Sequence, residues 1–138
     1  MNAAVETTIP AIGQHWAAQG GIYIGARLIE GVAHHIVIPG GIEHDILNVA
    51  FADVEKVIPK EINGHADWRA PDQEDLMLAY INAREHFVHA GDDSFYWSRS
   101  VHHNWPWAFD FEYGGTGTSY RSDEFRVRPF RSFPDSSL

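Results

Sequence analysis

The sequence predicts an α+β fold in which two helices pack on a small twisted antiparallel sheet with long loops. Its 138 residues are enough for one domain with one continuous core. Aromatic residues make up 13% of the chain and there are 12 glycines, which favours strands and loops over a helical bundle. Two segments with helical periodicity interrupt the β-rich runs. We therefore expect a single domain over residues 1–138, with an ordered core from roughly 12 to 132.

The first half predicts a hairpin followed by two helices. After a loose lead-in over residues 1–12, the β-rich runs 22–28 and 34–38 are joined by a short turn at Glu30-Gly31. Residues 45–59 form the first expected helix, and its apolar residues recur at steps of three and four: Ile46, Val49, Ala50, Val54, Val57 and Ile58. The second helix follows an N-cap at Asp72, with Asp75 in the position of a capping box. Its expected apolar face is Leu76, Ala79, Tyr80 and Ala83.

The second half predicts short aromatic strands. We expect three of them, at residues 95–99, 107–111 and 125–130. Residues 113–118 read as a glycine-rich turn or hairpin tip, because glycine supplies backbone conformations that tight turns need. Residues 132–138 read as a frayed tail.

Charge and composition exclude several classes of function. The formal charge of −9 argues against direct binding of nucleic acid, which normally uses a basic face. No window is long and apolar enough for a membrane helix, and the first ten residues do not resemble a secretory signal. Cysteine is absent, which favours an intracellular or virion location. We therefore expect a protein in the host cytoplasm or on a virion, with no membrane partner.

Acidic and basic residues are unevenly distributed. Twelve carboxylates lie between residues 43 and 93: Glu43, Asp45, Asp53, Glu55, Glu61, Asp67, Asp72, Glu74, Asp75, Glu85, Asp92 and Asp93. Four arginines lie near the last predicted strand: Arg121, Arg126, Arg128 and Arg131. The pattern is consistent with a molecule that is acidic on one side and basic on the other, or simply with two solvated faces.

Four motifs together resemble a known family. They are Asp67-Trp68-Arg69-Ala70-Pro71, Tyr96-Trp97-Ser98, Trp107-Ala108-Phe109-Asp110-Phe111 and Arg126-Val127-Arg128-Pro129-Phe130-Arg131. Their order resembles the bacterial and phage family typified by the C-terminal domain of the Legionella collagen-like adhesin. That family has a C-type-lectin-like fold and is related to formylglycine-generating enzymes. The sequence departs from the family pattern at Ala70, where leucine is usual, and at Arg99, where a small hydroxyl residue is common.

The resemblance implies which residues are structural and which bind a ligand. It implies a phage- or prophage-encoded protein with structural positions at Trp68, Arg69, Tyr96, Trp97, Trp107, Arg126 and Arg128. Because Val127 separates Arg126 from Arg128, the two arginines are expected to leave the strand on one face. Ligand binding in such domains lies in the long loops before the last strand, here His102, His103, Asn104, Trp105, Tyr113, Thr116, Thr118, Tyr120 and Arg121.

Other chemistries have weaker support in the sequence. The calcium-binding signatures of C-type lectins are missing, and formylglycine-generating chemistry needs cysteines that the chain lacks. His86 and His89 are spaced to share a helix face and Ser98 coexists with histidines, but no metalloprotease or nucleophile-elbow motif surrounds them. We therefore expect no enzyme activity, no metal and no cofactor.

Two functions of different classes follow. The first is a non-catalytic recognition module that binds a protein or a cell-surface glycan through its aromatic loops, as in adhesion. The second is an acidic intracellular inhibitor that covers the basic nucleic-acid-binding surface of a host protein, which its salt sensitivity would distinguish. A homo-oligomeric subunit of a larger assembly is a third, weaker prediction.

Overall fold

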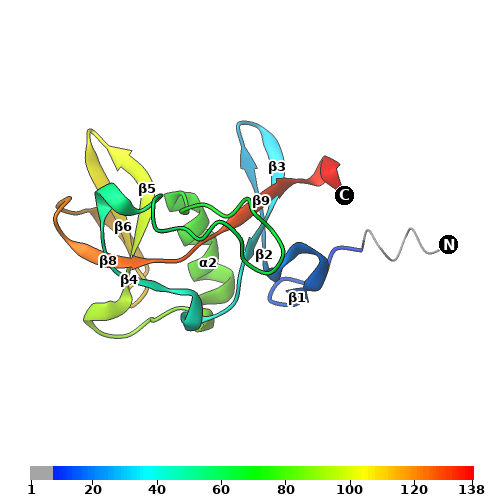
Figure 1. Cartoon of the computed structure of the whole chain (residues 1–138), viewed down its shortest axis with the longest axis horizontal. Coiled ribbons are helices and arrows are strands. Elements are labelled where there is room, and N and C mark those ends of the chain that lie inside the picture. Colours follow the sequence, from blue (N-terminus) through cyan, green and yellow to red (C-terminus); the bar gives the residue numbers. More distant parts are fainter. Residues whose placement is uncertain (1–7) are drawn as a thin grey trace.

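The computed structural model describes residues 8–138, which form two mostly antiparallel sheets with a helix between them (Figure 1). The first sheet has the order β1 (His15–Trp16), β2 (Gly21–Ile29), β3 (Val32–Ile38) and β9 (Arg131–Pro134). The second has the order β4 (Ile46–Ala50), β8 (Glu124–Val127), β5 (Phe95–His102), β6 (Trp105–Asp110) and β7 (Gly115–Thr118). The helix α2 spans Gln73–Ala83. Short 3-10 turns occupy Ala17–Gln19, Ile42–His44, Phe51–Asp53, Arg84–His86, Asp92–Ser94 and Asp135–Ser137.

The predicted hairpin is confirmed as β2 and β3. Their turn is Glu30-Gly31, and both residues have positive φ, at 51° and 81°. Two consecutive positive φ angles match the right-handed twist of the flanking strands, which explains the glycine at the second position. A bulge between Tyr23 and Gly25 bends β2 toward the helix.

The predicted helix after Asp72 is also confirmed. The backbone N–H of Asp72 donates to Asp75 Oδ2 at 2.8 Å and completes the expected capping box. Asp75 is fully buried, and its two oxygens accept from Arg27 Nε at 2.8 Å and Arg69 Nη1 at 2.7 Å. The first turn of the helix is therefore attached both to β2 and to the loop that precedes the helix.

The expected helix over residues 45–59 is wrong. Residues 46–50 form β4, which pairs with β8, and residues 51–53 form a 3-10 turn. The three-residue step from Ile46 to Val49 arises because the register of β4 shifts between these residues, where Asn48 has a φ of 57°. An irregular strand followed by a tight turn thus buries the same apolar residues that a helix would. Among residues 8–138, α2 is the only α-helix.

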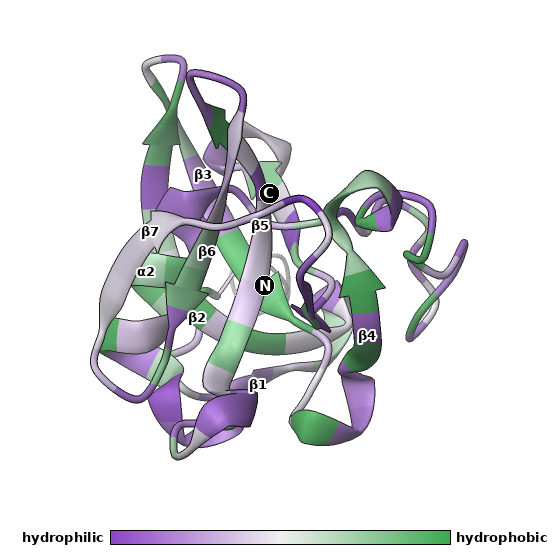
Figure 2. Ribbon diagram, turned by 90° about the vertical axis from the view of Figure 1, so that its left-hand side faces the viewer, coloured by the Kyte–Doolittle hydropathy of each residue, from purple (hydrophilic) through white to green (hydrophobic). Residues whose placement is uncertain are grey.

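Two further expectations need correction near the C-terminus. Residues 115–118, expected as part of a turn, form the edge strand β7, which Figure 2 shows near white on the hydropathy scale. The expected frayed tail instead contains β9, which pairs with β3 and buries Phe133. The three aromatic strands are present, although the last ends at Val127 before Phe130 forms an isolated bridge with Arg69.

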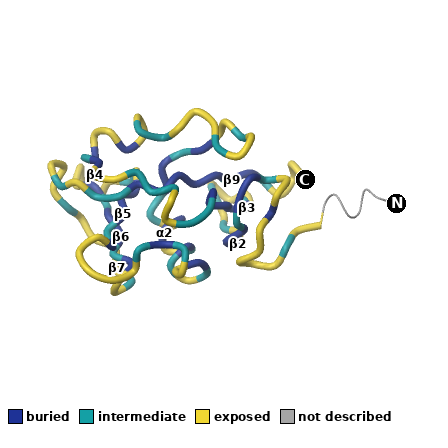
Figure 3. Tube along the Cα trace, turned by 60° about the horizontal axis from the view of Figure 1, so that its bottom comes forward, coloured by how far each residue is buried: buried dark blue, intermediate teal, exposed yellow. Residues whose placement is uncertain are grey.

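The core lies where α2 meets both sheets. One cluster joins Ile24 and Ile36 of the first sheet, Leu76 of α2, and Tyr96 and Phe109 of the second sheet. Two smaller clusters lie beneath β4 and beneath β1. Burial follows this arrangement, since most strands and α2 contain buried residues while much of the connecting chain is exposed (Figure 3). Loops supported by a packed scaffold often carry binding residues, and several of the exposed loops lie at the edges of the second sheet.

Candidate recognition site

A buried ion-pair cluster fixes the scaffold behind the site. Arg128 Nε and Arg126 Nη1 donate to the two oxygens of Asp45 at 2.7 and 3.1 Å. The Tyr96 hydroxyl donates to the same carboxylate at 2.6 Å. Burial, together with the charge of Asp45 and this hydrogen bond, raises the pKa of Tyr96, so the phenol stays protonated. Arg126 of β8 and Arg128, the residue after β8, thus bind the same carboxylate and join the end of this strand to the turn that leads into β4.

The tryptophans of the resembling motifs lie at different depths. Trp97 is fully buried and donates its Nε1–H to the Val49 carbonyl at 2.6 Å, while Trp68 donates to the Ile62 carbonyl at 2.9 Å. Arg69 contacts Asp75, as described above. Trp107 is only half-buried, and its ring lies 5.6 Å from that of His102. Trp107 is therefore partly exposed next to the turn between β5 and β6.

The acidic and basic segments pair with each other instead of forming opposite faces. Asp72 accepts from Arg27 at 2.7 Å and Arg99 at 2.8 Å. Burial alone would raise the pKa of Asp72, but these guanidinium groups outweigh that effect and lower it. Of the four arginines near the last strands, three form ion pairs: Arg126, Arg128 and Arg131. Of these four arginines, only Arg121 has no ion pair with a carboxylate of residues 8–138.

Five of the predicted ligand-binding residues gather at one end of the second sheet. We call this surface the aromatic rim, defined as Asn104, Trp105, Thr118, Tyr120 and Arg121. The rim lines two adjoining hollows of about 240 and 430 Å³, to which Ser119 and Ser122 also contribute. Its geometry comes from the tight turn between β5 and β6 and from the loop between β7 and β8, which lie against each other here.

Contacts within and between the two loops hold the rim in place. The rings of Trp105 and Tyr120 meet edge to face with centroids 5.7 Å apart, yet the residues are 50% and 67% exposed. Arg121 Nη2 donates to the Asn104 carbonyl at 2.7 Å and closes one loop onto the other. His103 and Asn104 have positive φ, at 49° and 70°, so they form the turn that presents Trp105.

The remaining predicted residues lie outside the rim. The rings of His102 and His103 contact each other, with centroids 4.3 Å apart, and the ring of His102 also packs against that of Trp107. Tyr113 is 80% exposed beyond the opposite end of β6, which at about 3.3 Å per residue lies roughly 17 Å away. Thr116 lies on β7, and its hydroxyl donates to the Ala108 carbonyl at 3.3 Å. The resemblance therefore grouped residues from both ends of one strand.

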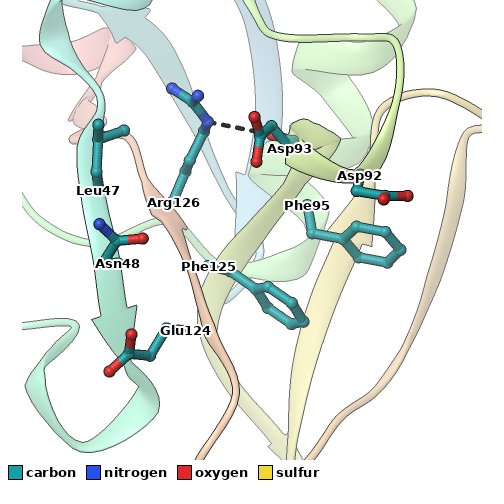
Figure 4. A pocket seen from close by; sticks show the side chains of 8 residues that line it. All are labelled: Leu47, Asn48, Asp92, Asp93, Phe95, Glu124, Phe125 and Arg126. Atoms are coloured by element: carbon teal, nitrogen blue, oxygen red, sulfur yellow. Dashed lines mark hydrogen bonds between the residues drawn. The ribbon is translucent and has the colours of Figure 1, made fainter.

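Sequence reasoning missed a further hollow, away from the rim, which we call the β4–β8 cleft. It has a volume of about 220 Å³ and is lined by Leu47, Asn48, Asp92, Asp93, Phe95, Glu124, Phe125 and Arg126 (Figure 4). The wrong helix at 45–59 hid it, because the cleft exists only when residues 46–50 pair with β8. The one available signal was the Asp92-Asp93 pair, which in the sequence counted only among the acidic residues.

The histidines do not converge on a metal site among residues 8–138. No group of three or more His, Asp or Glu side chains in that range is arranged to hold an ion. His89 Nδ1 instead bonds the Phe87 carbonyl at 2.8 Å, and His35 lies between Tyr23 and Asp135 at 2.8 and 2.7 Å. In the same range no helix is both long and apolar enough to cross a bilayer.

Comparison with known proteins leaves the family open. No family model matches the chain, and no curated protein matches it. The mixed α+β architecture, rich in sheet and with one described helix, thus stands on the structure alone. The C-type-lectin-like resemblance remains a prediction from the motifs.

Proposed function

We propose that this protein is a non-catalytic recognition module that binds a protein ligand through the aromatic rim. The observation that carries the proposal is the exposure of Trp105 and Tyr120, in contact with each other, beside two hollows. Tryptophan, tyrosine and arginine are the residue types that most often dominate binding energy at protein interfaces. The rim presents one of each on adjacent loops, and a rigid scaffold supports them.

The composition of the rim favours a protein over a glycan. No carboxylate lines either hollow, and the only side-chain amide there is that of Asn104. Exposed aromatic rings with small hydroxyl residues suit an apolar side chain of a partner. A glycan remains the other outcome of the test.

The test compares two aromatic surfaces of the same chain. Wild-type protein, a Trp105→Ser/Tyr120→Ser variant and a Tyr113→Ser control are immobilised and exposed to host lysate and to a glycan array. We expect a protein that wild type and control retain and that the rim variant loses, with at least a tenfold fall in affinity when binding is remeasured with the purified partner. Equal retention by all three proteins would overturn the proposal, and array binding lost only by the rim variant would reassign the ligand to a glycan.

The second candidate, an acidic inhibitor of a basic host protein, is favoured by a separate observation. Six of the ten cationic side chains are arginines already in ion pairs with carboxylates of the chain: Arg27, Arg69, Arg99, Arg126, Arg128 and Arg131. The excess negative charge is therefore left on exposed carboxylates, where it attracts a basic surface over a Debye length. A partner that is released by 0.5 M salt and is retained by the rim variant would support this function; salt-resistant retention would exclude it.

A further inference from the structure

The β4–β8 cleft has the size of a site for one side chain. Its volume of about 220 Å³ lies below the ~300–1,000 Å³ typical of small-molecule sites. Leu47 and Asn48 form one wall on β4, residues 124–126 of β8 form the floor, and the turn at 92–93 closes the far side (Figure 4). The cleft shares no residue with the aromatic rim.

Two stacked phenylalanine rings line part of the cleft. The rings of Phe95 and Phe125 are stacked with centroids 5.2 Å apart and planes inclined by 24°. Both residues are half-buried. The ring of Trp97 packs against that of Phe125, with centroids 4.6 Å apart. Aromatic faces attract cations through the ring quadrupole, and planar guanidinium groups also stack on them.

The charge around this surface is negative. Asp92, Asp93 and Glu124 are exposed, and their carboxylates have no hydrogen bond or ion pair with any side chain or backbone group of residues 8–138. The one cation that lines the cleft, Arg126, is fixed by the backbone carbonyl of Asp93 at 3.1 Å and by Asp45 at 3.1 Å. Three unpaired carboxylates thus face one arginine that is already bound.

The lining of the cleft suits an extended organic cation better than a metal ion. A metal ion needs several ligands that converge on one point, and no such group exists among the described residues. A guanidinium group spreads its charge over a plane and carries five N–H donors that can reach separate acceptors. We propose that the β4–β8 cleft binds the side chain of an arginine from a partner protein, with its plane against a phenylalanine ring of the cleft and its N–H groups toward the carboxylates.

The test uses short peptides as probes. The chain is titrated with acetyl-Gly-Arg-Gly-amide and with the citrulline and lysine analogues, and backbone amide shifts are followed by NMR at low salt. We expect millimolar binding of the arginine peptide that shifts the amides of Asn48, Glu124 and Phe125. Citrulline, which has the same shape without the charge, should bind at least fivefold more weakly, and so should lysine, which lacks the plane.

Matched variants separate a specific site from general attraction to an acidic protein. Asp93→Asn/Glu124→Gln and Glu61→Gln/Glu74→Gln remove the same number of charges from exposed positions, but only the first pair lines the cleft. We expect the first variant to lose at least fivefold in affinity and the second to stay within twofold of wild type. Equal loss in both variants, equal binding of citrulline or lysine, or shifts elsewhere in the chain would each overturn the proposal. The proposal is independent of the aromatic rim, so its test stands whether or not the rim variant binds.

Discussion

Replacing Asp45 is the most direct test of what holds the two sheets in place. Its side chain is 1% exposed and accepts hydrogen bonds from Arg126, Arg128 and Tyr96. Arg128 is fully buried, so Asp45→Asn leaves a buried positive charge without its counter-ion. Breaking a buried pair in this way typically costs about 3–5 kcal/mol. We expect the lower end, about 3 kcal/mol, because Arg128 keeps the carbonyls of Gly40 and His86 at 2.9 and 2.8 Å.

The assay is urea unfolding followed by tryptophan fluorescence, to which the buried Trp97 contributes. With a slope of ~1–3 kcal/mol per molar urea, the expected loss lowers the midpoint by roughly 1–3 M. The matched control is Asp67→Asn, which removes the same charge from a 57% exposed partner of Arg131 and should cost no more than about 1 kcal/mol. The reasoning is refuted if Asp45→Asn and Asp67→Asn have the same midpoint.

Two further predictions concern the helix start and the C-terminal strand. Asp72→Asn keeps an N-cap acceptor but removes the charge that its arginine partners bind, so we expect a loss of about 1–2 kcal/mol at pH 7. The folded-state pKa of Asp72 is lowered below its unfolded value of ~3.9. The stabilisation by the ionised carboxylate is therefore complete above the unfolded pKa and is lost as pH falls through the folded pKa. If the difference in urea midpoint between wild type and Asp72→Asn does not narrow below about pH 4, the charge of Asp72 is not its source. Phe133→Ala should cost about 3 kcal/mol because Phe133 is buried, against less than about 0.5 for the exposed Tyr113→Ala, and equal melting temperatures would show that β9 is not part of the core.

The elements that the sequence predicted correctly are those with local signals. Glu30-Gly31 defines a hairpin turn by its own backbone preference, and the Asp72 and Asp75 pair marks a helix start within four residues. The failures are non-local. β4 is a strand because Phe125 and Val127 pair with it from more than 70 positions away, and no local pattern contains that information. In β9, four residues with a single buried ring are too few to show alternation.

The candidate site was likewise predicted only in part. Asn104, Trp105, Tyr120 and Arg121 were predicted from the family resemblance, which places ligand binding in the loops before the last strand. Their separation from Tyr113 depends on the length and direction of β6, which the motif order does not give. The β4–β8 cleft could not be predicted while residues 45–59 were expected to form a helix. The side chains of Leu47 and Asn48 point in different directions in a helix than in a strand.

The placement of residues 124–134 has a consequence for biosynthesis. β8 lies between β4 and β5 in the second sheet, and β9 completes the first sheet against β3. A nascent chain that has not yet released this segment from the ribosome leaves β3, β4 and β5 with open edges, together with the apolar residues that cover them. Neither sheet closes during most of translation, so folding waits for these eleven residues and then completes both sheets together. Premature termination before residue 124 would therefore yield an aggregation-prone fragment and not a smaller folded domain.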